Sequence, residues 1–153
     1  MSEEHSYPYV VRGAKIYCGC GSHYSYLDMP VCHGSYIREK PMMHEKDCKV
    51  GLNANIAPFG ACFSPGNTNK KIIINDAQRA MPAGFDDNDN PIPQPMPIEG
   101  GRLCVPMLGD KWCDAKEDTL VDGVPALTVE CTLTCSIGGE DGVVRFWDDG
   151  QGV

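Results

Sequence analysis

Long apolar runs are missing from this sequence. No stretch approaches the ~20 consecutive apolar residues that a membrane-spanning helix needs. The first residues, MSEEHSYPYVV, are acidic and lack the apolar centre of a secretory signal peptide. We therefore expect a protein that is cytoplasmic in the producing cell. If it leaves that cell, it does so by a route that needs no signal peptide.

Basic residues are also scarce. The chain has 13 lysines and arginines against 21 aspartates and glutamates, which gives a net charge of -8. No basic run is longer than Lys70-Lys71. Because an acidic surface repels a phosphate backbone, this composition excludes nucleic acid as a partner.

Helical periodicity is a third absence, since no window shows a convincing helical repeat of apolar residues. With 17 glycines and 12 prolines in 153 residues, the chain favours a mainly β single domain of short strands and tight turns, with at most one or two short helices. One such helix is expected at 75–81, before an extended, proline-rich surface loop at 82–98. Strands are predicted at 9–17, 124–129 and 143–147, with a hairpin between the last two signalled by turn residues at 138–142. The isoleucine run at 72–74 is too short to classify by its period.

Paired CxxC motifs, the usual mark of a zinc ribbon or a dithiol redox centre, are absent although the chain has nine cysteines. The odd count would leave one thiol outside a closed disulfide framework, and a reducing compartment favours thiols over disulfides. In YCGCGSH (17–23), Cys18 and Cys20 would share one face of a strand, as Cys131 and Cys135 would further on. Such cysteines are either metal ligands or small core residues, and their spacing leaves both interpretations open.

No arrangement typical of an enzyme stands out. Cys32 and His33 are sequence neighbours, which a strand would point to opposite faces. No pair of carboxylates lies in an apolar setting that would tune a pKa. We therefore expect no catalytic residues and no enzymatic turnover.

Five motifs follow one another along the chain. They are YVVRGAKIYCGCGS (9–22), VCHGSYI (31–37), DCKVGLNANIAPFGACFSP (47–65), CVP (104–106) and LTVECTLTCSIGGEDGVV (127–144). Their order resembles the PAAR-like family, long catalogued as a domain of unknown function. The most specific piece is NIAPFGAC (55–62), followed by the closing L-x-C-x-x-G-G at 133–139. The chain departs from the family after the FG-x-C motif, and Cys32, Cys113 and Cys131 look like additions to its usual cysteines.

The resemblance implies a small conical domain at 9–148, with a proline- and aspartate-rich insert near 82–98 and tails at 1–8 and 149–153. It implies a spike tip, one per trimer, that caps the trimeric β-helical spike of a contractile injection apparatus. That apparatus would be type VI secretion-like, phage-tail-like or an extracellular injection particle. The tip would sharpen the spike for membrane puncture, contact the target membrane only on firing, link effector cargo and be expelled with the apparatus.

The resemblance also implies one zinc ion, which would cross-link loops where a tapering body has little room for a core. Six residues at motif-matching positions are metal candidates, but a tetrahedral zinc site takes four ligands, so some of the six must be core residues. His23 lies outside the matching motif and is predicted to be a surface residue. The metal candidates at motif-matching positions are Cys62, Cys104, Cys48, His33, Cys135 and Cys18, and the residues assigned to structural turns are Asn55, Phe59, Gly60, Gly138 and Gly139.

Two other functions stay open at this point. The chain could be a stand-alone cysteine-rich zinc-binding protein, which would carry metal well above one or two equivalents. It could also be a secreted effector adaptor that uses the same domain for delivery.

Overall fold

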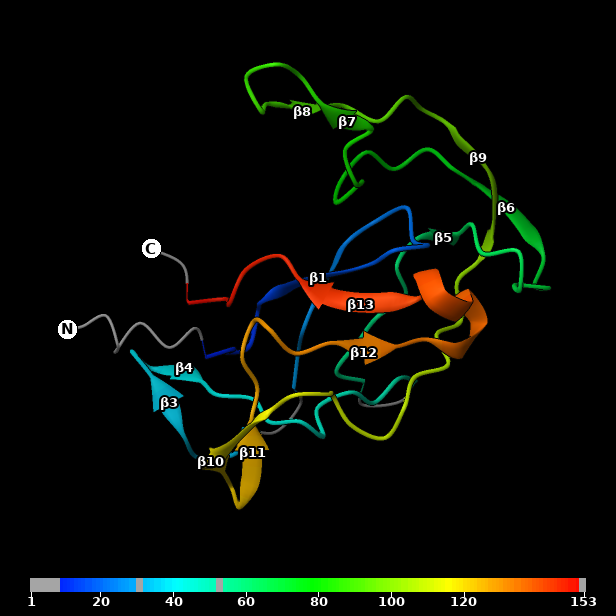
Figure 1. Ribbon diagram of the computed structural model, residues 1–153. Coiled ribbons are helices and arrows are strands. Elements are labelled where there is room, and N and C mark those ends of the chain that lie inside the picture. The colour runs from blue at the N-terminus through cyan, green and yellow to red at the C-terminus, as the bar shows by residue number, and fades with distance from the viewer. Residues whose placement is uncertain (1–8, 30–31, 52–53, 152–153) are drawn as a thin grey trace.

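Short strands joined by turns make up nearly all of the regular structure (Figure 1). The computed structural model describes residues 9–29, 32–51 and 54–151, and it is 38% strand and 4% helical. In these ranges the helical element is the 3₁₀ segment η2 (Ser136–Asp141), which holds Gly138 and is interrupted at Gly139 (φ 58°). The predicted mainly β class with at most one or two short helices is therefore confirmed. No helix in the described ranges has the length and apolar character to cross a membrane.

A four-stranded antiparallel sheet forms the centre of the fold, in the order β12-β13-β1-β2. Its register places Ile16 of β1 opposite Phe146 of β13. The predicted first strand begins later than expected, because Gly13 (φ 99°) turns the chain before β1. The strands are β1 (Lys15–Cys18), β2 (Ser25–Tyr26), β12 (Leu133–Thr134) and β13 (Val143–Phe146).

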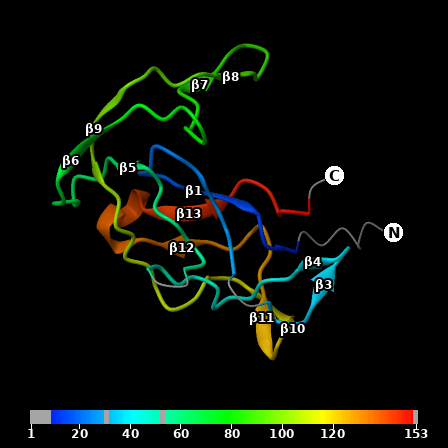
Figure 2. The same cartoon turned by 180° about the vertical axis from the view of Figure 1, so that it is seen from behind.

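A three-stranded sheet in the order β5-β9-β6 and three hairpins surround this centre. Figures 1 and 2 both show the β7–β8 hairpin projecting from one end of the molecule and the β10–β11 hairpin from the other. The isoleucine run at 72–74, which the sequence pattern left unclassified, lies in β6. The three-stranded sheet consists of β5 (Ala61–Cys62), β6 (Lys71–Ile74) and β9 (Ile98–Leu103), and the hairpins of β3 (Tyr36–Ile37) with β4 (Lys40–Pro41), β7 (Gly84–Phe85) with β8 (Pro91–Ile92), and β10 (Lys116–Val121) with β11 (Val124–Ala126).

The turn residues at 138–142 do close a hairpin, but its first strand is β12 and not the segment 124–129. The short η2 joins β12 to β13, whereas β11 pairs with β10 across the two-residue loop Asp122-Gly123. Both loop residues have positive φ (52° and 79°), as a type I′ hairpin turn requires. This Asp-Gly pair is a hairpin signal that the prediction above omits.

The predicted helix at 75–81 is wrong. The segment pairs instead with residues 22–24: Tyr24 N–H donates to Arg79 O (2.9 Å), and Met81 N–H donates to Ser22 O (2.8 Å). These bonds to a distant part of the chain replace the bonds between neighbouring turns that a helix would make. Residues 82–98, which follow, are mostly exposed, as predicted.

The core is a cluster of buried side chains that joins the central sheet to the neighbouring loops. Trp112 and Phe59 are its largest fully buried members, and Trp112 stacks on Phe146 with ring centroids 4.7 Å apart. Cys48 and Cys131 belong to the same cluster, where each thiol packs as a small apolar group.

His23, predicted to lie on the surface, is only 3% exposed, so that prediction is wrong. Its Nε2 lies 2.8 Å from Asp76 O, which can only accept, so Nε2 carries the proton. Its Nδ1 therefore accepts a hydrogen bond from Ser22 Oγ (2.8 Å), and that oxygen in turn accepts from Ala61 N–H (2.8 Å). The residue that accepts the hydrogen bond of His23, Asp76, lies 53 positions away along the chain.

Candidate functional site

Two histidines and an aspartate meet beside the β3–β4 hairpin. His33 precedes β3, and His44 and Asp47 follow β4, so the hairpin folds the two segments onto each other. One candidate ligand atom from each residue lies within 4.8 Å of the other two. No other three His, Cys, Asp or Glu residues in the part of the chain that the structure describes come together in this way.

The three side chains are in direct contact. His33 Nε2 lies 3.0 Å from both Oδ1 and Oδ2 of Asp47, and His44 Nδ1 lies 3.6 Å from Oδ2. The two imidazole rings stack with centroids 3.9 Å apart and planes 20° from parallel. The Asp47 side chain is 7% exposed and that of His33 is 17% exposed, so the group is most open to solvent at His33.

Asp47 and His44 are fixed to the core by backbone contacts. His44 N–H donates to Asp47 Oδ2 (2.8 Å), and the buried Trp112 Nε1–H donates to Asp47 O (3.0 Å). His44 also forms a β-bridge with Ala126 of β11. Within the part of the chain that the structure describes, the hydrogen bonds and ring contact of the His33 side chain, by contrast, go to Asp47 and His44.

The electrostatics favour a neutral imidazole at His44, beside the buried side chain of Asp47. No lysine or arginine in the described ranges lies within ion-pair distance of Asp47. Burial lowers the pKa of His44, and this effect outweighs the opposing effect of the Asp47 carboxylate. Because neutral imidazole is the form that binds a metal, the group can accept a cation near neutral pH without first losing a proton from His44.

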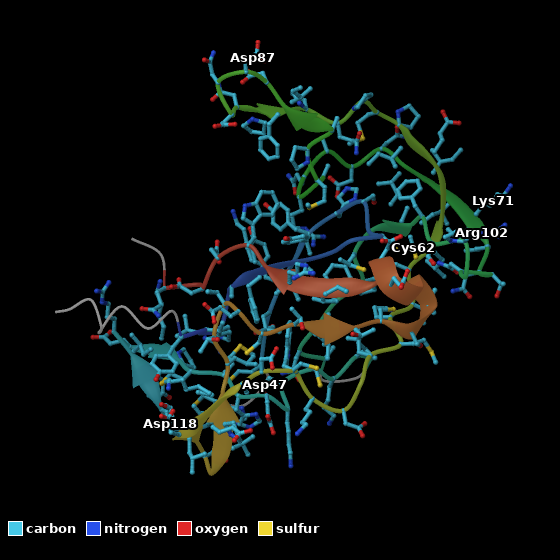
Figure 3. The ribbon with its side chains drawn as sticks, in the orientation of Figure 1. Asp47, Cys62, Lys71, Asp87, Arg102 and Asp118 are labelled. Carbon is cyan, nitrogen blue, oxygen red and sulfur yellow. The ribbon has the colours of Figure 1, made fainter. Side chains whose placement is uncertain are left out.

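Four of the predicted ligands gather in a different part of the fold, around β5 and the start of η2. Burial is the main cause of the raised pKa of Cys18 and of Cys104, and Cys135 adds a smaller electrostatic effect to both. Cys62 adds a similar effect to the pKa of Cys104, so the four thiols lie near one another. Figure 3 labels Cys62 and Asp47 and shows them far apart. Of the other two predicted ligands, His33 belongs to the group described above.

The last of the six, Cys48, directly follows Asp47 in the chain, but its thiol is not part of the three-residue group. Its thiol donates to Gly109 O (3.4 Å), and burial raises its pKa to about 11. The structure therefore distributes the six predicted ligands over three places and does not join them in one site.

The gathered cysteines do not fit a zinc ion as they stand. No three of them bring their sulfur atoms within 4.8 Å of one another, whereas a Zn–S distance of about 2.3 Å places ligand sulfurs about 3.8 Å apart. Burial raises the pKa of Cys18 and of Cys104 to about 11, which keeps both thiols protonated. Backbone N–H groups of Phe59 and Met107 donate to the sulfurs of Cys104 (3.3 Å) and Cys135 (3.4 Å). All nine cysteines are free thiols, and metal binding by them stays a prediction.

The residues assigned to turns between 55 and 60 lie where the chain reverses into β5. Asn55 is buried, its Oδ1 accepts from Lys49 N–H (3.0 Å), and its Nδ2 donates to Asp28 O (2.8 Å). Phe59 is 1% exposed, and Gly60 follows it at φ 74°. The buried amide thus ties two loops together, and the glycine allows the turn.

Two residues of the site, His44 and Asp47, were not among the predicted ligands. Their spacing, His-x-x-Asp, is a weak signal because it also occurs in ordinary turns. Only the β3–β4 hairpin brings them to His33, and neither of its two-residue strands was predicted. A search for histidines and carboxylates on both sides of a short hairpin would have included them.

A family model described as "Domain of unknown function (DUF4280)" matches residues 10–151, which is nearly the whole chain. No curated protein matches the sequence. No solved structure matches it either.

Proposed function

The chain belongs to this DUF4280 family, and we propose that it is the tip of a contractile injection apparatus, a non-enzymatic protein that caps a trimeric β-helical spike. The five motifs that resemble the PAAR-like family fall almost entirely inside the matched residues 10–151. The mainly β body of short strands supports a mechanical role, because such a body can extend the strands of a spike by edge pairing.

The observation that carries this proposal is the open edge of β6. β6 is the outer strand of the β5-β9-β6 sheet in the described ranges, and its Ile73 is 64% exposed. An outer strand leaves unpaired N–H and C=O groups that another strand can meet, and the exposed Ile73 offers an apolar contact as well. Lys71 at the start of β6 is a charge of the kind that limits unspecific edge pairing, and we assign the edge to a partner strand at the blunt end of the spike.

Co-expression with the trimeric spike protein of an injection apparatus tests this proposal. Native mass spectrometry is expected to show one copy of this chain per three spike chains. Ile73→Lys should abolish the complex, because a charge on the edge strand opposes pairing. The matched control is Ile92→Lys, which changes an exposed isoleucine (43%) of β8 and should leave the complex intact. A 1:1 complex, no complex, or equal binding by both variants would contradict the proposal.

The proposal also includes where the tip is assembled, what it contacts, and one bound metal ion. The tip would be loaded in the producer cytoplasm, expelled on firing and only then contact the target membrane, with effector cargo as a further partner. One bound zinc ion is part of the proposal. A stand-alone zinc-storage function is less well supported, since the described ranges hold one group of three ligand atoms within 4.8 Å and not several.

A further inference from the structure

We propose that His33, His44 and Asp47 bind one divalent transition-metal ion, with Zn²⁺ as the ion that the donor set fits. The ion would fasten the segment before β3 to the core beside β11. This inference does not rest on the spike-tip function, because it follows from the geometry of the three side chains. The proposed ligands are two imidazoles and a carboxylate, in place of the cysteine thiols that the resemblance implies.

The donor atoms suit such an ion. Zinc accepts His nitrogen and Asp oxygen at about 2.0–2.2 Å, which places ligand atoms about 3.3 Å apart around a tetrahedron. His33 Nε2 already lies 3.0 Å from both Asp47 oxygens, so small movements make room for the ion. Calcium and magnesium prefer ligand sets made of oxygen, and two imidazoles select against them.

The charge of the group points to the same ligand. The Asp47 carboxylate is 7% exposed and has only the two histidines as counter-charges in the described ranges. The two rings stack with centroids 3.9 Å apart beside this carboxylate, so two imidazoles and one negative charge meet in one place. A divalent ion between the three side chains would give the carboxylate a positive partner while the imidazole nitrogens act as uncharged ligands.

Hydrogen bonds orient two of the proposed ligands, Asp47 and His44, whereas His33 has fewer contacts and can move to bind the ion. Asp47 Oδ2 accepts from His44 N–H, and Asp47 O accepts from Trp112 Nε1–H. His44 Nδ1 accepts from Lys46 N–H, so both residues have hydrogen-bond partners of the kind that orient metal ligands. In the described ranges the contacts of the His33 side chain go to these two residues, so the ion would be the main link between its segment and the core. If His44 binds through Nδ1, the ion replaces the bond from Lys46 N–H, which is long at 3.2 Å.

The test is a metal titration of the full-length protein after treatment with a chelator. Co²⁺ serves as the spectroscopic probe and Zn²⁺ as its competitor. We expect one equivalent of Co²⁺ to bind, to be displaced by Zn²⁺, and to show no charge-transfer absorption from thiolate to cobalt. His33→Ala and Asp47→Asn should each weaken binding at least about 100-fold, the upper end of what even outer-shell partners contribute.

Two control variants separate the alternatives. Cys104→Ser removes a gathered thiol and should leave Co²⁺ affinity unchanged, and so should His5→Ala, which removes a histidine outside the described residues. Circular dichroism of each metal-free variant checks its fold, and His33→Ala, at the most exposed ligand, keeps the test valid if Asp47→Asn does not fold. A thiolate absorption band, binding that survives His33→Ala, or no binding at all would each overturn the proposal. None of these results changes the spike stoichiometry measured separately.

Discussion

Replacing Gly60 by alanine should destabilise the protein more than the backbone conformation alone explains. Gly60 has φ 74°, and a Cβ built on it would lie 2.4 Å from both His23 Nδ1 and Ser22 Oγ. Both atoms are buried and hydrogen-bonded to each other, so neither side chain can swing away freely. The added methyl group must therefore break this hydrogen-bonded pair or shift the turn before β5.

The expected magnitude is the sum of three effects. An alanine at positive φ costs about 1–2 kcal/mol. Displacing Ser22 also leaves the buried Ala61 N–H without its acceptor, which costs about 1–3 kcal/mol. The stiffer unfolded chain returns about 0.4–1 kcal/mol. The net loss in the free energy of unfolding is then roughly 1–5 kcal/mol, by combining these ranges.

Gly123→Ala is the matched control, because Gly123 has φ 79° and no atom within 4 Å of an added Cβ. It should lose only about 0.5–1 kcal/mol, from strain less the unfolded-state effect. Urea unfolding followed by far-UV circular dichroism gives both values by linear extrapolation. If the two variants differ by less than about 0.5 kcal/mol, the packing around Gly60 does not limit this turn and the reasoning fails.

Two further predictions concern single polar contacts. Asn55→Ala removes both hydrogen bonds by which a buried amide joins two loops, and it should lower the free energy of unfolding in urea by about 1–3 kcal/mol. The control Asn88→Ala, at an exposed position between 82 and 98, should change it hardly at all. Equal losses for the two variants would contradict the bridging role of Asn55. Cys32 should be the thiol that iodoacetamide modifies fastest near neutral pH, because a hydrogen bond from Tyr36 lowers its pKa and raises its thiolate fraction. Tyr36→Phe should move the rate–pH profile of Cys32 to higher pH, and modification of the exposed Cys113 at the same rate would refute the effect.

Local sequence patterns predict the mainly β class of the fold, but they do not predict which distant segments pair with each other. The β-branched and aromatic run at 143–147 predicts a strand because such side chains pack well on a pleated surface, and β13 lies there. The three isoleucines at 72–74 also lie in a strand, but they are too few to show a period. The helix expected at 75–81 failed because tertiary bonds to residues 22–24 outweigh a weak local preference. His23 was misplaced for the same reason, since the partner that buries it is remote in sequence.

The candidate site was predictable only in part. His33 was among the predicted ligands through the VCHGSYI motif, but it was grouped with cysteines. The structure places it with His44 and Asp47, because the short β3–β4 hairpin reverses the chain between them. A hairpin of two-residue strands has almost no periodicity to detect, so the partners of His33 could not be found from local pattern.

Buried polar side chains stabilise this turn-rich chain by hydrogen bonding to backbone groups, and Asp47 differs from the others because it is charged. Ser22 and Asn55 each satisfy backbone groups that short strands leave unpaired, and no buried side-chain nitrogen or oxygen in the described ranges lacks a partner. Asp47 satisfies the His44 N–H in the same way. Ser22 and Asn55, however, are neutral, whereas Asp47 adds a buried negative charge that a hydroxyl or an amide in the same role would avoid. The backbone contact alone therefore does not explain a carboxylate here, whereas its contacts with His33 and His44, and the cation proposed to lie between the three side chains, do.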